Sequence, residues 1–562
     1  MASEPLPQEI ILLLCEELAA HRDFDTLFQC SVVSRRVARI ALEKLYSIQE
    51  LSLVSSGETY NRLKWSRLWR SIILSSTGNE TAYPYCVYVR LLSFGDLEEC
   101  LYDMTRDEGV CDSFFEGPMQ QFLRLREVPM QQSLSKWRQP QRIKVKSTLA
   151  ECADSITEYI KRFADESEST AALLHLEGVH FPHHLLPSWI SRLRTLTSLR
   201  IRDGSVLGVG AARAISECCP NFVDLTCFYC SNADEDLAAF FQTLRLNSLQ
   251  RFEIISHNGI GPQALTALNA HAMSLRSLIF GSLPPQGMAA LNLLSSCTAL
   301  EKLSIEPDPH NNIGNMLANK KDVLKEISVW ISSCKSLKHL STNHFLNALS
   351  VVRDVLAVPD IRLQSLSIIG FLDYAAYNDG AAEATWTALG KQDDLESLTL
   401  GIQNHSADSL TISQGSSLAD SILNLKKLTS LNLMQAHVDM PVIRHFSETL
   451  TNLVEFSFGG DNMDDSILGP LSTLWHLKLL SITAPSAFTF HGLSDFITKL
   501  AMPSQEGIKI DILYQHGHLS FDLEEITALR DIMMERLKGR IDITYTSYPD
   551  ELHEEDFDDF SE

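Results

Sequence analysis

The sequence of 562 residues has little of three things: long apolar runs, basic residues and catalytic motifs. No stretch approaches the roughly 18 apolar residues that a membrane-spanning helix needs. The densest apolar run near the start, residues 10–15, has acidic neighbours and no basic stretch before it, unlike a secretory signal. We therefore expect neither a membrane span nor a targeting segment.

Basic residues are outnumbered by acidic ones. The chain has 47 Lys and Arg against 71 Asp and Glu, a formal net charge of -24. Nucleic acids and anionic membranes select basic surfaces, so this balance argues against both as main partners. Part of the acidic excess lies in the tail, residues 546–562, which we expect to be disordered, with an interaction tail as the alternative.

Signatures of catalysis and metal binding are also scarce. We find no G-x-S-x-G, phosphate-binding loop, dinucleotide fingerprint or H-E-x-x-H. The C-x-x-C pair Cys227 and Cys230 has no second pair at zinc-ligand spacing, and the histidines in 175–184 have no matching ligands. Buried thiols of a reducing compartment, cytoplasmic or nuclear, explain the cysteines better. The sequence predicts no enzyme, no metal and no cofactor.

A repeated pattern, apolar-x-x-apolar-x-apolar, runs through most of the chain. It starts at residues 196, 222, 249, 275 and 300, in steps of 26, 27, 26 and 25, and recurs from 337, 363, 395, 428, 453 and 477. An earlier copy fits if Ala171 is its first position. Residues 323–329, in the longest gap, read as a helix or an extra strand. Residues 88–94 are strand-like, and so are residues 48–54.

Alternating apolar positions indicate short strands with one buried face, and helical stretches such as 208–219 and 233–244 separate them. A strand and a helix every 25 or so residues is the leucine-rich repeat, which stacks into an α/β solenoid of horseshoe form. We predict a helical module over 1–50, a connecting region with irregular early repeats over 51–170, the solenoid over 171–545 and the acidic tail over 546–562.

The side chains at positions 3, 5 and 7 of each repeat are expected on the concave face. Many of them are serines, and few are charged. One interpretation is that serine simply tolerates a crowded strand surface; the other is a neutral, hydrogen-bonding groove for a protein partner, with a basic spot at Arg200, Arg202 and Arg251. The candidate target-binding residues are Arg200, Arg202, Arg251, Glu253, Lys302, Ser365, Ser397 and Ser430.

Residues 6–46 show no repeat period and read as compact helices. The first is the apolar stretch 6–18, and Asp25 is a plausible N-cap for the next, in which Leu27, Cys30, Val33 or Ser34, and Val37 fall at helical spacing. Two interpretations of the first helix stay open. It is either a cap that covers the end of the solenoid or a docking device for another protein.

The order of residues in this segment resembles an F-box. The matching residues are Leu6, Pro7, Glu9, Ile10, Leu27, Cys30, Val33, Ser34, Arg35, Arg36, Leu45 and Tyr46. With the repeats that follow, the chain resembles the F-box/leucine-rich-repeat proteins of filamentous fungi. The resemblance implies the substrate-recognition subunit of a Skp–cullin–F-box ubiquitin ligase, with cullin and RING subunits reached through a Skp-type adaptor. It implies adaptor contacts by Leu6, Pro7, Ile10, Leu27, Cys30, Val33, Ser34 and Val37.

The competing interpretation is a leucine-rich-repeat scaffold that binds proteins without a role in ubiquitin transfer. In either case a target protein is implied that the sequence does not name.

Overall fold

The computed structural model describes most of the chain as helices and short strands. The residues it describes are 6–48, 62–78, 80–125, 143–167, 171–231, 233–309, 321–345, 348–370, 381–401, 410–500, 505–515 and 521–545. The acidic tail and residues 49–54 of one strand-like candidate lie outside them. The chain forms two compact units, Met1–Leu275 (unit 1) and Arg276–Glu562 (unit 2).

Unit 1 begins with helices and continues into a ladder of strands. Its helices are α1 (Gln8–Ala20), α2 (Phe24–Ser31), α3 (Arg35–Ile48), α4 (Arg62–Ser75), α5 (Tyr85–Tyr88), α6 (Phe94–Met104), α7 (Glu108–Phe114), α8 (Val145–Ser167), α9 (Leu186–Arg192), α10 (Val209–Cys218), α11 (Asp234–Thr243) and α12 (Pro262–Leu268). Its strands are β1 (Leu91–Ser93), β2 (His175–Gly178), β3 (Ser198–Asp203), β4 (Asp224–Tyr229) and β5 (Arg251–Ile254). They pair in parallel, each with the next along the chain.

Unit 2 consists of strands and helices that mostly follow one another in turn along its described length. The strands are β6 (Ser277–Leu283), β7 (Lys302–Pro307), β8 (His339–Asn343), β9 (Ser365–Ile369), β10 (Ser397–Gly401), β11 (Leu410–Ile412), β12 (Ser430–Val438), β13 (Glu455–Gly459), β14 (Met463–Asp464), β15 (Leu479–Ala487), β16 (Lys509–Gln515) and β17 (Arg540–Tyr545). The helices are α13 (Pro285–Met288), α15 (Lys321–Ser333), α16 (Ala348–Leu356), α18 (Ala381–Leu389), α19 (Ser417–Leu423), α20 (Met440–Thr449), α21 (Leu468–Leu471), α22 (Phe490–Lys499) and α23 (Leu523–Leu537).

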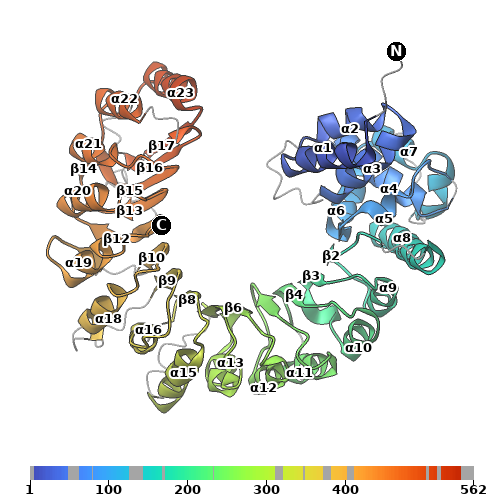
Figure 1. Cartoon of the computed structure of the whole chain (residues 1–562), viewed down its shortest axis with the longest axis horizontal. Coiled ribbons are helices and arrows are strands. Elements are labelled where there is room, and N and C mark those ends of the chain that lie inside the picture. The colour runs from blue at the N-terminus through green and yellow to red at the C-terminus, as the bar shows by residue number, and fades with distance from the viewer. Residues whose placement is uncertain are drawn as a thin grey trace, which may run out of the picture. The chain divides into compact units, whose positions relative to one another are not determined.

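The apolar repeat positions align from strand to strand. In unit 2, Leu366 of β9 pairs with Leu398 of β10, and Leu398 pairs with Leu431 of β12. All three leucines are buried, because strand side chains alternate between two faces and this face meets the helices. Removing one such side chain down to alanine typically costs about 3 kcal/mol. Within each unit the helices follow one side of the ladder and leave the other strand face free of helices (Figure 1).

Parallel strands joined by helices at this repeat length define a leucine-rich-repeat solenoid. The predicted α/β class, with a helical N-terminal region ahead of the repeats, is therefore confirmed. Residues 323–329 lie in helix α15, and the strand-like stretch 88–94 contains β1, which extends the ladder before β2.

The predicted start of the first repeat is wrong by two residues. Leu176 pairs with Leu199, which is the fourth position of its own repeat, so Leu173 and not Ala171 is the first position. Ala171, Leu173, Leu174 and Leu176 are all apolar, and the sequence alone did not distinguish the two frames. In the corrected frame Glu177 occupies position 5, directly beside Arg200.

Candidate functional site

The N-terminal module consists of helices α1–α3, and local capping explains where two of them begin. The side chain of Asp23 accepts hydrogen bonds from the backbone N–H of Thr26 (3.0 Å) and from its hydroxyl (2.7 Å), so it caps α2. The predicted cap, Asp25, lies within the first turn of that helix instead. The chain leaves helical form between α2 and α3, and there the Ser34 hydroxyl accepts a hydrogen bond from Val37 N–H (3.4 Å).

A broad apolar surface of this module faces solvent. On α1, Ile10 and Leu14 are spaced four residues apart, and Leu6, which precedes the helix, is 63% exposed. The opposite side of the helix, with Ile11 and Cys15, is buried in the module. We define the apolar docking face by the exposed side chains Leu6, Ile10, Leu13, Leu14, Phe28, Val32 and Val33. Contiguous apolar side chains that the module itself leaves uncovered are typical of a surface that a partner covers.

Most of the predicted adaptor-binding residues are accessible, and one is not. Leu6, Pro7, Ile10, Val33 and Ser34 are exposed, and Cys30 and Val37 are half-buried. Leu27 is completely buried, so it belongs to the core of the module and cannot contact a partner in this state. The spacing of Leu27, Cys30, Val33 and Val37 in the sequence predicted one continuous helix with all four on one face. The helix is interrupted at residues 32–34, so Val33 is exposed while Leu27 is buried.

Four residues of this face were not predicted: Leu13, Leu14, Phe28 and Val32. The run of apolar residues 10–15 was the available signal. It is too continuous for one buried stripe, so part of it had to remain uncovered.

Helix α3 ties the module to the helices that follow. Lys44 of α3 forms an ion pair with Glu16 of α1 (2.8 Å). The Tyr46 ring stacks on Tyr85, with ring centroids 4.9 Å apart, and its hydroxyl hydrogen-bonds with Ser71 of α4 (2.8 Å). Burial of Tyr46 raises the pKa of its hydroxyl to about 12, so this group stays protonated at neutral pH.

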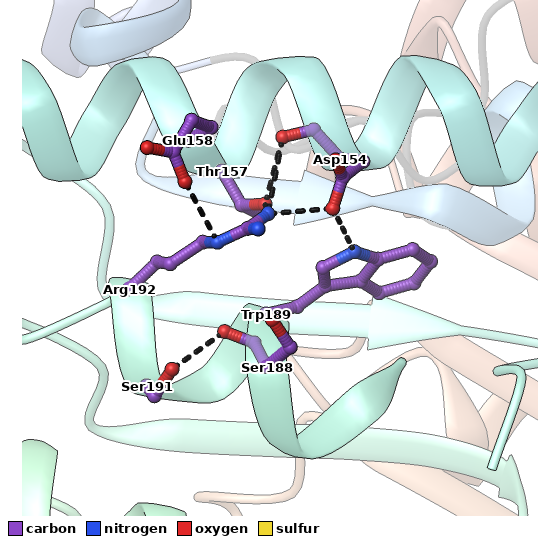
Figure 2. Close-up of polar contacts among 7 residues, drawn as sticks. All are labelled: Asp154, Thr157, Glu158, Ser188, Trp189, Ser191 and Arg192. Carbon is purple, nitrogen blue, oxygen red and sulfur yellow. Dashed lines mark hydrogen bonds and ion pairs between the residues drawn. The ribbon is translucent and has the colours of Figure 1, made fainter. Parts of the chain in front are cut away.

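Helix α8 contacts helix α9 of the repeats through the guanidinium group of Arg192. Arg192 of α9 donates from Nη1 to a carboxylate oxygen of Asp154 (2.6 Å) and to the Thr157 hydroxyl (3.1 Å), and its Nε pairs with Glu158 (3.0 Å). The Trp189 indole N–H donates to the same Asp154 oxygen (3.3 Å). Figure 2 shows these side chains converging between α8 and α9. We call this set, Asp154, Thr157, Glu158, Trp189 and Arg192, the α8–α9 lock.

On the strand face of unit 1, two of the three predicted arginines already have carboxylate partners. Arg251 pairs with Asp224 on the neighbouring strand (3.2 Å), and Arg200 lies 3.9 Å from Glu177. Burial raises the pKa of Glu177, and the nearby Arg200 partly opposes that shift. The basic spot is thus largely neutralised, and Arg202 is the arginine of the three without an ion pair among the described residues.

The predicted Glu253 lies half-buried on β5 of unit 1, beside Thr226. On the strand face of unit 2, the four remaining predicted residues fall into one row. Strand pairing places Lys302, His339, Ser365, Ser397 and Ser430 side by side on β7, β8, β9, β10 and β12. The serines are half-buried and Lys302 is exposed. Burial lowers the pKa of His339, and the neighbouring Lys302 and Lys338 lower it further.

The hydroxyl groups of this face bond sideways to neighbouring strands. The Ser430 hydroxyl donates to Glu455 (2.9 Å), and the Ser367 hydroxyl hydrogen-bonds with the amide oxygen of Asn343 (3.1 Å). These contacts fit both interpretations of the serines, the crowded strand surface and the hydrogen-bonding groove, which therefore both stay predictions.

Within the described ranges, no group of three or more His, Cys, Asp or Glu side chains could hold a metal ion. The thiols of Cys227 and Cys230 are both buried, and burial raises the pKa of Cys227 well above its ordinary value. His180 instead pairs with the buried carboxylate of Glu98 (3.0 Å). Among the helices that the structure describes, none has the length and apolarity needed to cross a membrane.

Comparisons with known proteins give distant likenesses only. No family model matches the chain, and no curated protein matches it. An internalin (InlF) from Listeria monocytogenes is 15% identical, with a TM-score of 0.34, and the match covers 70% of this chain and 95% of the internalin. TLR13 in its complex with ssRNA13 is 14% identical, with a TM-score of 0.29 and coverage of 70% and 52%. Rad7, from the Rad7 and Elc1 complex in yeast, is 16% identical, with a TM-score of 0.30 and coverage of 56% and 90%. The fold assignment rests on the strand–helix repeat itself.

Proposed function

We propose that this chain is the substrate-recognition subunit of a Skp–cullin–F-box ubiquitin ligase. The observation that carries the proposal is the apolar docking face on a three-helix module whose sequence resembles an F-box. One side of α1 is packed in the module, and the other exposes Ile10, Leu13 and Leu14 to solvent. A cap for the solenoid would bury such side chains against the first repeat.

In this proposal the two parts of the chain have separate tasks. The apolar docking face binds the Skp-type adaptor, and through it the cullin and RING subunits. The strand face of the repeats binds a target protein. Transfer of ubiquitin is catalysed by other subunits, and the chain raises the local concentration of the target and orients it. Such a ligase acts in the cytoplasm or the nucleus.

A triple variant, Ile10→Ser, Leu13→Ser and Leu14→Ser, tests the adaptor contact. These side chains are exposed, so the module should keep its fold while adaptor binding weakens by at least about a hundredfold, as expected when three apolar side chains are removed from one interface. Binding to a purified Skp-type adaptor is measured by calorimetry, and circular dichroism checks the fold. The matched control is Leu246→Ser, because Leu246 is 74% exposed in the same unit, outside the module. An unchanged affinity of the triple variant would rule out the proposed contact.

The alternative is a leucine-rich-repeat scaffold whose helical module binds a partner unconnected with ubiquitin. A scaffold of this kind needs only the strand face of the repeats to bind its target, and that face is the same whether or not the chain serves a ligase. Co-purification decides between the two: cullin and RING subunits accompany the adaptor if the chain serves a ligase, and they are missing if it is a scaffold.

A further inference from the structure

Position 7 of three successive repeats in unit 1 carries an unusual set of side chains: Arg202, Phe228 and Ile255. Strand pairing sets Asp203 beside Tyr229, which places Arg202 beside Phe228. The backbone N–H of Ser256 donates to the carbonyl of Phe228 (2.7 Å), so Ile255, directly after β5, lies beside Phe228. Because side chains alternate along a strand, this row lies on the strand face, next to the row that contains Arg200.

Both apolar members of the row are uncovered. Phe228, on β4, is 43% exposed, and Ile255, directly after β5, is 42% exposed. The alternate positions Cys227 and Ile254, which face the helices, are buried. Adjacent apolar side chains on an otherwise polar surface are typical of a binding site.

Arg202 supplies the positive charge of the row, and Glu253 in the neighbouring row supplies a negative charge on the side of Ile255. Arg202 is exposed and has no ion pair among the described residues, whereas Arg200 and Arg251 lie beside Glu177 and Asp224. An unpaired arginine beside an exposed aromatic ring, in a chain of net charge -24, presents one available cation. It suits a carboxylate, which carries one charge; a phosphate carries up to two and calls for further unpaired cations.

We propose that Arg202, Phe228 and Ile255 bind a short segment of the target protein that carries a carboxylate and a bulky apolar side chain two or three residues apart. The spacing follows from the ladder. Neighbouring strands lie about 4.8 Å apart, so the row spans about 10 Å, which an extended peptide covers in about three residues. The carboxylate binds Arg202, and the apolar side chain packs on Phe228 and Ile255. This assignment rests on the target-binding role given to the strand face under the proposed function.

A phage-displayed library of random heptapeptides, selected on the full chain, tests the inference. The expected result is enrichment of peptides with an aspartate or glutamate two or three residues from a leucine, isoleucine, phenylalanine or methionine. The most enriched peptide is then synthesised with a fluorescent label, and its affinity is measured by polarisation. Arg202→Glu should weaken binding about tenfold or more, because it replaces attraction by repulsion, and Phe228→Ser should weaken it to a similar degree.

The control is Arg213→Glu, which reverses another exposed arginine on helix α10 and should leave peptide binding unchanged. The inference is overturned by no enrichment, by enriched peptides without the acidic and apolar pair, or by enriched peptides that bind both variants as they bind the natural chain. Replacing the acidic residue with phosphoserine separates the two anions, and binding more than tenfold tighter would show a phosphate site instead. The triple variant of the apolar docking face should bind the peptide normally, so failure of the adaptor contact and failure of this site are distinguishable.

Discussion

His271 lies fully buried in unit 1, and its ring bridges two backbone groups. Its Nδ1 accepts from the backbone N–H of Leu249 (3.4 Å), and its Nε2 donates to the carbonyl of Phe241 (3.2 Å). This arrangement requires the neutral ring, with its proton on Nε2. Burial lowers the pKa of His271, and the contact with Phe241 opposes this in part. A second proton would remove the acceptor that Leu249 uses.

This lowered pKa makes the stability of unit 1 depend on pH. The unfolded chain takes up the proton near the ordinary histidine pKa of about 6.5, whereas the folded chain takes it up only at lower pH. The contribution of His271 is therefore fully present above about pH 6.5 and is lost as the pH falls below that value. We expect His271→Gln, which keeps a donor and an acceptor, to flatten the fall in urea midpoint between pH 7.5 and pH 5.5. The exposed His445→Gln serves as control, and an equal slope in all three proteins would contradict the assignment.

Successive helices of the solenoid are joined by carboxylates that cap the next repeat. Asp234, in the first turn of α11, accepts hydrogen bonds from the backbone N–H groups of Gly261, Gln263 and Ala264 at the start of α12, each 2.8 Å long. A Cβ atom at residue 261 would lie 2.6 Å from the Asp234 carboxylate, so a larger residue there would displace this carboxylate from its place in the cap. In unit 2, Asp465 binds the backbone N–H of Thr489 (3.0 Å) and its hydroxyl (2.6 Å) in the same manner.

We expect Asp234→Ala to lower the free energy of unfolding of unit 1 by about 2 kcal/mol, because three N–H groups lose their acceptor. Asp236→Ala is the matched control. It lies in the same first turn, is exposed and caps no other helix among the described residues, so its loss should cost less than about 0.5 kcal/mol. Urea denaturation followed by circular dichroism measures the free energy of unfolding of both variants. Equal losses would show that the two aspartates act only through their negative charge at the start of α11, and that the hydrogen bonds of Asp234 to the next helix contribute nothing.

The elements differ in how well the sequence predicts them. The repeats that start between residues 196 and 477 were predictable from the sequence. A shift of the strand register by one residue would turn buried leucines such as Leu199 or Leu431 toward solvent, so the apolar pattern fixes the register. The last strands, β16 and β17, were not singled out as repeats, since Gly507 and Lys538 stand where other copies have leucine. Partners that lie far apart in sequence, such as Asp234 with Gly261, leave no periodic signal. The carboxylate beside Arg200 became visible only through the register of the strands, because the predicted frame of the first repeat placed Glu177 at another position.

At the scale of the whole molecule, the proposed function requires that the docking module and the first repeats move together. Within unit 1, contacts run from α3 through Tyr46 and Ser71 to α4, and the Ser76 hydroxyl that follows α4 then hydrogen-bonds with the Ser155 hydroxyl of α8 (2.7 Å). The α8–α9 lock completes the connection to the repeats (Figure 2). Orientation of a bound target therefore depends on these polar contacts together with the pairing of β1 with β2 and the packing of Phe94 on Trp189.

Arg192→Ala tests this connection, because the side chain is only 17% exposed and contacts Asp154, Thr157 and Glu158. Its loss leaves two carboxylates without their cation, and we expect it to weaken the packing of α8 on α9 by about 2 kcal/mol. Hydrogen exchange should then speed up at the amides of α8 and α9, while those of α1–α3 keep their protection. The control is Arg194→Ala, which breaks the pair with Asp165 (3.0 Å); this arginine is 59% exposed, and such pairs contribute little. If both variants exchange like the natural chain, apolar packing alone holds α8 in place, and the lock has no role in orienting the target.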